Sequence, residues 1–184
     1  MNFNRKLSET SVRIGEVRFS YAHVFEPHST NGGDPKYSVS LLIPKSNTGA
    51  VKLIEEAVNA AKQLGKTSKW GGKIPGNCKM PLRDGDTERE DDENYAGHYF
   101  LNASASAKSR PAVKVADGGE LFDAMDGEEF YSGCYGAAVL NFYPFDANGN
   151  RGVAAGLNVV VKTRDGEKLG GGVNVEEALS GLYD

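Results

Sequence analysis

Cysteine, tryptophan and methionine are scarce in this chain of 184 residues, which has two, one and three of them. Cys78 and Cys134 lie far apart, and neither has another Cys or His at metal-ligand spacing. A disulfide framework needs several paired cysteines, and a structural zinc site needs four ligands in characteristic pairs. The scarcity therefore argues against both, so the cysteines are interpreted as small hydrophobic residues and no cofactor is expected.

Long apolar runs are also missing. Segments 137–140 and 159–161 fall far short of the roughly 20 apolar residues that a membrane helix needs. The N-terminal residues 1–6 carry positive charge, but the apolar stretch of a secretory signal does not follow them. With 39% hydrophobic and 25% charged residues, the composition predicts one soluble globular domain in the cytoplasm, with no membrane partner.

An excess of positive charge, which nucleic-acid-binding proteins usually have, is absent from the chain as a whole, whose net charge is -4. The distribution is uneven, however. Residues 1–83 carry thirteen basic and six acidic side chains, whereas residues 84–93 carry one and seven, and residues 173–184 carry none and three. The pattern predicts a basic body with an acidic loop at 84–94, so net charge does not exclude a nucleic-acid partner.

Alternating apolar residues predict most of the secondary structure. In the first strand the alternation includes Tyr21 and shifts at Gly15, which indicates a bulge. The Asn148-Gly149 pair predicts a hairpin turn between the last two strands. A helix is expected from Asn47 or Thr48 to Leu64, with Gly65 as its stop. The predicted strands are 12–25, 37–43, 98–106, 112–116, 130–145 and 152–164.

This order of elements predicts a mainly β protein. Five or more strands, one α-helix between early strands and extended loops favour a five-stranded Greek-key OB-fold barrel, and the 23 glycines suit strands that bend at barrel corners. A β-sandwich is the second choice. The OB-fold domain is expected to span 1–172, and 173–184 to form a short acidic tail after the glycines at 170–172.

The only tryptophan, Trp70, lies in a stretch without acidic residues between Glu56 and Asp84. Single-stranded DNA offers phosphates and unstacked bases, so its binder needs cations beside an aromatic side chain, and each stacked base contributes about 1–3 kcal/mol. Lys69, Trp70 and Lys73 fit this requirement. The alternative is an exposed helix end and loop, with Trp70 packed on the core.

Tyrosines on one face of the strand 130–145 are further candidates for base stacking. The alternative for each is a half-buried sheet residue. Lys108 and Arg110 lie where a turn is expected, and exposed loop charge is the alternative there. The predicted contacts with single-stranded DNA are Lys36, Tyr37, Lys66, Lys69, Trp70, Lys73, Lys79, Arg83, Tyr99, Lys108, Arg110, Tyr131, Tyr135, Tyr143 and Arg151.

The motifs of catalytic and metal sites fit poorly. An EF-hand loop that starts at Asp84 needs Gly and Glu where the chain has Arg89 and Tyr95, so the acidic segment is interpreted as a disordered, solvated loop. Gly65-Lys66-Thr67 lacks the first glycine and the preceding strand of a P-loop. No nucleophile and base are paired by spacing, and the chain is expected not to be an enzyme.

Several segments, taken in order, resemble the single-stranded DNA-binding proteins of tailed bacteriophages. They are 20–27, 37–44, 81–86, 131–137, 142–145, 149–152 and 157–161. The resemblance implies an OB-fold protein that coats single-stranded DNA during phage replication and recombination, in the infected bacterial cell and without enzymatic activity. Single-stranded RNA is a weaker alternative ligand, and a monomer or homodimer is expected.

The same resemblance implies an acidic C-terminal tail with a terminal aromatic residue, which recruits replication proteins and competes with DNA. The corresponding residues are Glu176, Glu177, Tyr183 and Asp184. Only three acidic residues are present, so a short amphipathic docking helix is the alternative.

Two other functions are compatible with the sequence. The acidic loop is a candidate divalent-metal site for a phosphodiesterase or nuclease accessory, although it lacks a positioned base. A virion structural or decoration protein is also compatible with a small glycine-rich β domain. Within the leading hypothesis, the acidic loop acts as an internal DNA mimic that weakens non-specific binding.

Overall fold

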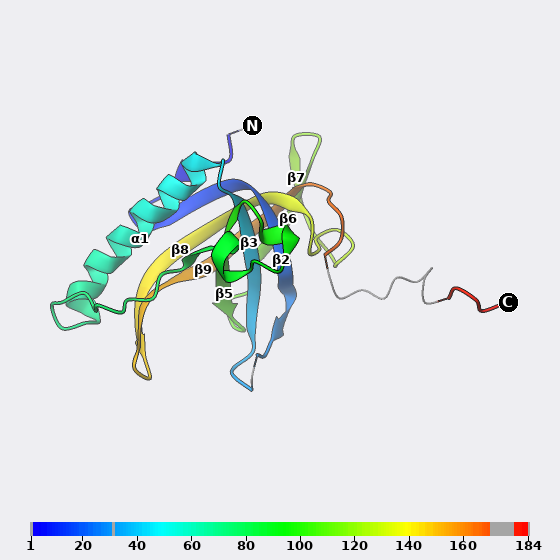
Figure 1. The fold of residues 1–184 in the computed structure, drawn as a ribbon. Coiled ribbons are helices and arrows are strands. Elements are labelled where there is room, and N and C mark those ends of the chain that lie inside the picture. The colour runs from blue at the N-terminus through cyan, green and yellow to red at the C-terminus, as the bar shows by residue number, and fades with distance from the viewer. Residues whose placement is uncertain (1, 31, 170–178, 184) are drawn as a thin grey trace.

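The computed structural model describes residues 2–30, 32–169 and 179–183. Its strands form a curved sheet, and its one long helix lies along one side of that sheet (Figure 1). The elements are β1 (Arg5–Lys6), β2 (Ser11–His28), β3 (Lys36–Pro44), α1 (Thr48–Ser68), β4 (Leu82–Asp84), α2 (Gly85–Glu88), the 3-10 helix η1 (Glu93–Tyr95), β5 (His98–Ser106), β6 (Ala112–Asp117), β7 (Glu120–Asp123), β8 (Tyr135–Ala147) and β9 (Asn150–Arg164).

Five of the strands close into a barrel. β2 pairs with β3, β3 with β5, β5 with β9, β9 with β8, and β8 with β2 again. All of these pairings are antiparallel except β5 with β9, which are parallel. The α-helix α1 follows the second barrel strand. This closed five-stranded barrel confirms the predicted OB-fold.

The barrel interior follows the alternation seen in the sequence. Val39, Leu41 and Ile43 of β3 are buried in the main core. The predicted bulge at Gly15 is confirmed, because the pairing of β2 with β8 shifts register between Ile14 and Val17. The predicted hairpin turn is also confirmed: Asn148 and Gly149 both have positive φ, 51° and 80°, as a type I′ turn requires.

The helix α1 begins where the sequence predicts but ends later. The Asn47 side chain accepts a hydrogen bond from the backbone N of Ala50 and so caps the first turn. The prediction that Gly65 ends the helix is wrong, because α1 continues to Ser68. Gly65 serves packing instead: a Cβ atom there would lie 2.6 Å from Pro144 and 2.7 Å from the Trp70 ring.

The acidic segment 84–95 is ordered, so the prediction of a disordered loop is wrong. It forms β4, α2 and η1, and the Tyr95 ring packs edge-on against Phe100, with ring centres 5.3 Å apart, beside Leu42. The Arg89 guanidinium lies 5.5 Å from the Tyr95 ring centre. A buried tyrosine therefore fixes a segment whose charge alone indicated solvation.

The predicted strands do not include the short strands β1, β4 and β7, and the predicted start of β8 is wrong. β6 and β7 pair through a turn at Gly118 and Gly119, which have φ of 61° and 84°. This hairpin continues the sheet beyond the barrel, because β6 pairs with β9. β8 begins at Tyr135 rather than at Phe130, since the chain turns at Gly133, whose φ is 113°.

Candidate nucleic-acid interface

The outer surface of β3 and β5 carries small polar side chains, which we call the polar face: Ser38, Ser40, Asn102 and Ser104. They alternate with the apolar residues inside the barrel, and the pairing sets Ser40 opposite Asn102 and Ser38 opposite Ser104. The Ser40 hydroxyl donates a hydrogen bond to the Asn102 side-chain oxygen. Asn102 is exposed, Ser38 and Ser104 are half-buried, and Ser40 is buried, so a ligand can reach this face most directly at Asn102.

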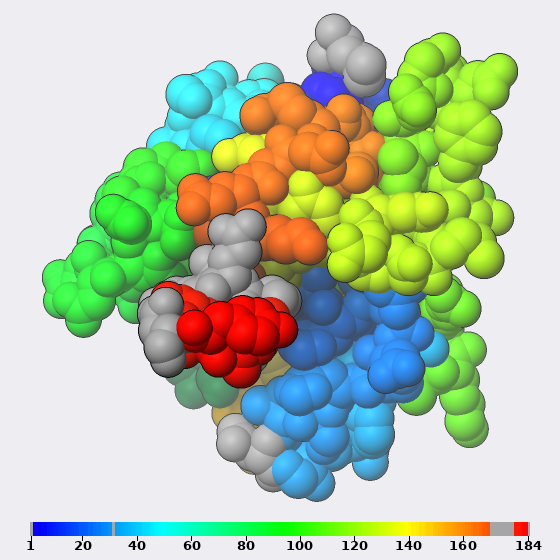
Figure 2. Space-filling view, turned by 90° about the vertical axis from the view of Figure 1, so that its right-hand side faces the viewer, coloured from blue at the N-terminus to red at the C-terminus, as the bar shows by residue number. Residues whose placement is uncertain are grey.

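A cavity of about 420 Å³ adjoins this face on β2, and we call it the Tyr21 cavity. The register of β2 against β3 shifts between Ser20 and His23, and Tyr21 has φ of 47° and is 56% exposed. The expectation that Tyr21 continues the inward alternation is therefore wrong. Ser132 and Asn94 also line the cavity, which lies where the segments coloured blue, yellow-green and orange meet (Figure 2).

Two histidines stand beside the cavity. The His23 and His28 rings are stacked, with centres 4.1 Å apart and planes 7° apart. Burial lowers the pKa of His23, and the neighbouring His28 lowers it further. His23 therefore adds an apolar ring face rather than a positive charge near neutral pH.

Two of the predicted tyrosines lie among cations, and we call this group the tyrosine–cation cluster. The Arg164 guanidinium lies 3.8 Å from the Tyr135 ring centre and the Arg18 guanidinium 5.2 Å from it. The amino groups of Lys162 and Lys168 each lie 5.5 Å from the ring centre of Tyr131.

The cluster is also tied together by hydrogen bonds. The Tyr131 hydroxyl donates to Asp165 over 2.7 Å, and burial, together with this carboxylate, raises the pKa of Tyr131. Sequence reasoning found the two tyrosines but missed Arg18, Lys162, Arg164 and Lys168, because these cations come from opposite ends of the chain. The distance in sequence between these cations and the tyrosines gives no indication that they meet in the folded protein.

Trp70 is a core residue, which corrects its assignment as an exposed ring for base stacking. Its side chain is 6% exposed, and its indole N–H donates to the backbone oxygen of Phe145 over 3.1 Å. The ring fills the space left by the missing side chain of Gly65. Tyr37 is likewise buried, with 8% of its surface exposed. The position of Trp70 matches the alternative stated for it, which is packing on the core, and the burial of Tyr37 corrects its assignment as a DNA contact.

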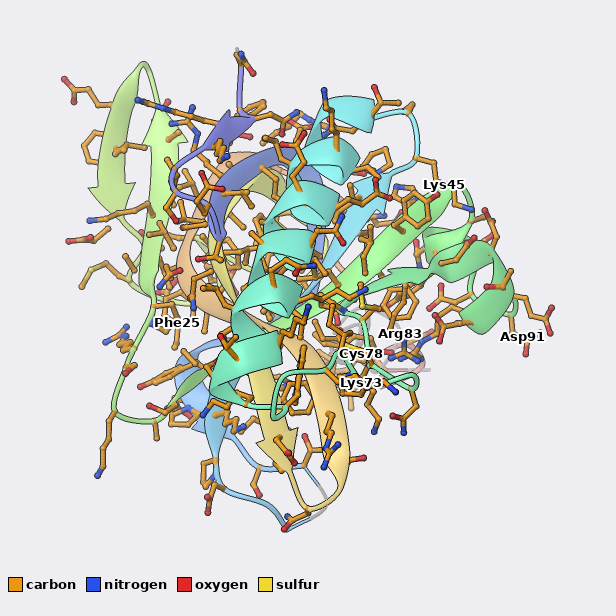
Figure 3. All side chains as sticks on the ribbon, turned by 90° about the vertical axis from the view of Figure 1, so that its left-hand side faces the viewer. Phe25, Lys45, Lys73, Cys78, Arg83 and Asp91 are labelled. Atoms are coloured by element: carbon orange, nitrogen blue, oxygen red, sulfur yellow. The ribbon has the colours of Figure 1, made fainter. Side chains whose placement is uncertain are left out.

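The remaining predicted residues fall into separate groups. Lys66, Lys69 and Lys73 are exposed near the end of α1, where Tyr143 lines a groove with Lys69. Figure 3 shows Lys73 on the connection that follows α1, Arg83 on the strand β4, and Asp91 further out on the acidic segment.

Three further contacts place Lys79, Arg83 and Tyr99. Lys79 lies against the β8–β9 hairpin, because its backbone N donates to Arg151 O over 2.9 Å. Arg83 pairs with Glu88 at 2.7 Å. The ring centre of Tyr99 lies 5.1 Å from the Lys45 amino group. Lys36, Lys108 and Arg110 are exposed near the far end of the β3–β5 pair, where Lys36 is opposite Ser106.

Acidic side chains of the segment 84–95 are largely committed to structure. Lys45 lies 2.8 Å from Asp84 and 2.7 Å from Asp86, and its hydrogen bonds lower the pKa of both carboxyl groups. Within the described ranges, no group of three or more His, Cys, Asp or Glu residues is placed to hold a metal ion. Cys134 is buried, which raises the pKa of its thiol to about 11.

The predicted tail residues are only partly visible. Glu176, Glu177 and Asp184 lie outside the described residues, as do the glycines at 170–172. Tyr183 is exposed. Among the residues that the structure describes, no helix is both long enough and apolar enough to cross a membrane.

Comparison with known proteins identifies the family. Residues 10–182 match the family described as Enterobacter phage Enc34, ssDNA-binding protein. The chain belongs to this Enc34 family. It is also 40% identical over 178 residues to the putative protein p50 of Acyrthosiphon pisum secondary endosymbiont phage 1, a match that covers 90% of this chain and 91% of p50.

Solved structures agree with the assignment to the Enc34 family. The single-stranded DNA-binding protein of bacteriophage Enc34 in complex with ssDNA superposes with a TM-score of 0.75 at 28% identity, over 92% of this chain and 98% of that one. A second Enc34 structure gives a TM-score of 0.70 at 27% identity, over 98% of both chains. The ssDNA-binding protein gp2.5 of bacteriophage T7, at 16% identity and a TM-score of 0.58, shares the fold.

Proposed function

We propose that this chain binds single-stranded DNA without sequence preference and coats it during phage DNA replication and recombination. Membership of the Enc34 family carries the proposal, because a member at 28% identity has been solved with ssDNA and superposes over 92% of this chain. The cytoplasm of the infected bacterium is the place of action, and no enzymatic step is required. Single-stranded RNA is the weaker ligand.

The DNA path follows the polar face. OB-fold barrels bind oligonucleotides on the surface of their second and third strands and with the loops that join strands one to two and four to five. In this barrel those strands are β3 and β5, and the loops are 29–35 and 148–149. The Tyr21 cavity and the tyrosine–cation cluster flank the polar face, so bases stack on the exposed Tyr21 ring. Arg18 donates to the Gly133 and Glu167 carbonyls and Arg164 pairs with Glu16 at 2.6 Å, and from these positions their remaining N–H groups contact phosphates.

The other predicted contacts divide according to their distance from this path. Lys36, Lys108 and Arg110 stand at one end of the polar face, and Lys79 and Arg151 stand at the β8–β9 hairpin, where they neutralise phosphates. Lys66, Lys69, Lys73 and Tyr143 lie by the end of α1 and have no place in this path. The tail with Tyr183 contacts phage replication proteins, and the free protein is a monomer or homodimer.

The experiment that tests the proposal is a titration of fluorescein-labelled oligo-dT, duplex DNA and oligo-U, read by anisotropy at several salt concentrations. If about five phosphates are neutralised, log K should fall against log salt with a slope of about -3.5 for a single strand. Oligo-dT is expected to bind more tightly than duplex DNA and RNA. Equal affinity for duplex DNA, or binding that does not depend on salt, would overturn the proposal.

The acidic segment is expected to weaken DNA binding. The side chains of Glu90 and Asp91 are exposed and make no ion pair within the described part of the chain. Glu90→Gln with Asp91→Asn should raise the affinity for oligo-dT at low salt by about twofold per charge, because a like charge about 10 Å from a phosphate costs roughly 0.4 kcal/mol in water. The matched control removes two exposed charges from α1, Glu55→Gln with Glu56→Gln, and should change affinity less. Equal effects of the two pairs would show that only net charge matters.

A further inference from the structure

The β6–β7 hairpin carries apolar side chains that are exposed instead of packed in the core. All four residues of β7 are exposed, and neighbouring residues of a strand point to opposite sides. Leu121 is 65% exposed, Phe122 is 49% exposed, and Met125 just beyond is 76% exposed. Exposed apolar residues gathered at one edge strand mark an interaction surface more often than scattered ones do.

The same hairpin is strongly acidic. Residues 117–129 contain six acidic side chains and no basic one. Lys114 neutralises Asp123 and Lys168 lies 3.5 Å from Glu128, but Asp117 and Glu120 make no ion pair within the described ranges. We call this surface, with Leu121, Phe122 and Met125, the acidic hairpin. A partner for it needs an apolar groove with a basic border.

Such a groove is present elsewhere on the same chain. Leu64, which is 56% exposed, and Tyr143, which is 41% exposed, line a groove of about 580 Å³ together with Pro144, Lys69 and Thr67. Lys62, Lys66 and Lys73 lie on the same part of the chain, and none of these lysines forms an ion pair in the described ranges. The one acidic lining residue, Asp146, pairs with Arg151 at 3.2 Å. We call this surface the basic groove.

The two surfaces lie at opposite ends of the molecule. Figure 1 shows β7 at the upper right and the end of α1, with the β8–β9 hairpin, at the lower left. One copy therefore cannot close the contact on itself. Complementary surfaces at opposite ends join copies head to tail, and the series stays open when the rotation between copies does not close a ring.

We propose that the acidic hairpin of one copy docks in the basic groove of the next copy along single-stranded DNA. The apolar side chains Leu121 and Phe122 cover Leu64 and Tyr143, while Glu120 faces Lys66 and Lys69. This contact gives the exposed apolar hairpin a role, and it uses Lys66 and Lys69, which lie off the DNA path. This head-to-tail contact rests on the proposed function, because single-stranded DNA brings the copies next to one another.

The contact is too small to hold free copies together at low concentration. Stable interfaces bury about 800 Å² on each partner and involve about 20–30 residues a side, whereas β7 has four residues. Neighbours bound to one strand meet at a high effective concentration, and a weak contact is then occupied. The signature is cooperative binding to long DNA by a protein that binds short DNA one copy at a time.

The test uses two single variants and their combination. Leu121→Lys sets a cation against the basic groove, and Leu64→Glu sets an anion against the acidic hairpin. Both positions are exposed, so folding should be preserved, and Leu7→Glu is the matched control at an exposed apolar position of the β1–β2 connection. Binding is measured to oligo-dT of about 10 nucleotides, and of about 60 nucleotides, which holds several copies at about 4–16 nucleotides per OB fold.

Each single variant should keep its affinity for the short DNA and lose at least about fivefold in cooperativity on the long DNA. The L64E/L121K double variant should regain cooperativity, because the lysine at position 121 of one copy then faces the glutamate at position 64 of the next. Wild-type cooperativity in both single variants, or none in the wild type, would overturn the proposed contact. If short DNA is not bound at all, the proposed function fails instead. In that case the contact is tested without DNA, by sedimentation at high protein concentration. If the wild type associates and neither single variant weakens this association, the proposed contact is rejected.

Discussion

Replacing Trp70 with alanine is expected to lower the free energy of unfolding by about 3–5 kcal/mol, the usual cost of removing a large buried aromatic side chain. The ring is 6% exposed and fills the space beside Gly65 and Pro144. Its loss opens a cavity between α1 and the β8–β9 hairpin. It also leaves the Phe145 carbonyl without the hydrogen bond that it now accepts from the indole N–H.

Urea denaturation of Trp70→Ala and Trp70→Phe separates these contributions. Phenylalanine keeps most of the packing and loses the hydrogen bond, so its cost should be smaller, about 1–2 kcal/mol. Because Trp70 lies off the proposed DNA path, folded Trp70→Phe should bind oligo-dT within about twofold of the wild type. A well-folded Trp70→Phe protein that no longer binds DNA would restore the original stacking hypothesis for this residue.

Placing two carboxylates on the polar face should weaken single-stranded DNA binding by at least about tenfold, or 1.4 kcal/mol. The change is Asn102→Asp with Ser104→Asp. The first substitution keeps the shape of the asparagine side chain and an oxygen that can accept the Ser40 hydroxyl, so the barrel should fold normally. Each new charge repels the phosphates of a strand that lies across β3 and β5.

The matched control adds the same two charges away from the polar face, through Ser8→Asp with Asn59→Asp. Ser8 lies on the β1–β2 connection and Asn59 on α1, and both are exposed. Anisotropy titrations with oligo-dT and a thermal melt are recorded for each protein. Equal losses of affinity in the two double variants, with unchanged melting, would mean that only net charge matters and would move the DNA site elsewhere.

Local signals in the sequence predicted the barrel well. The alternation in β3, the Asn148-Gly149 turn and the Asn47 cap depend on neighbours within a few residues, and each is confirmed. Gly65 shows the limit of such signals. A glycine after a helical pattern usually ends a helix, but here it makes room for a ring that the chain brings back five residues later.

The candidate site was less predictable, because its parts meet only in three dimensions. Trp70 lies among lysines in sequence, yet its ring is turned into the core and the lysines remain outside. Tyr21 continues an apolar alternation in sequence, but the register shift of β2 against β3 between Ser20 and His23 turns it to the surface. Tyr95 anchors an acidic segment that its high charge predicted to be a disordered, solvated loop. Bulges and long-range packing decide all three positions, and neither can be derived from local periodicity.

Photocrosslinking tests the central claim most directly. Oligo-dT in which single thymidines are replaced by 5-iododeoxyuridine is irradiated on the protein, and the adducts are mapped by mass spectrometry. If single-stranded DNA crosses the polar face, the crosslinks should lie on Tyr21, His23, Tyr131 or Tyr135. Crosslinks confined to Trp70 and Tyr143, at the far end of α1, would contradict the account.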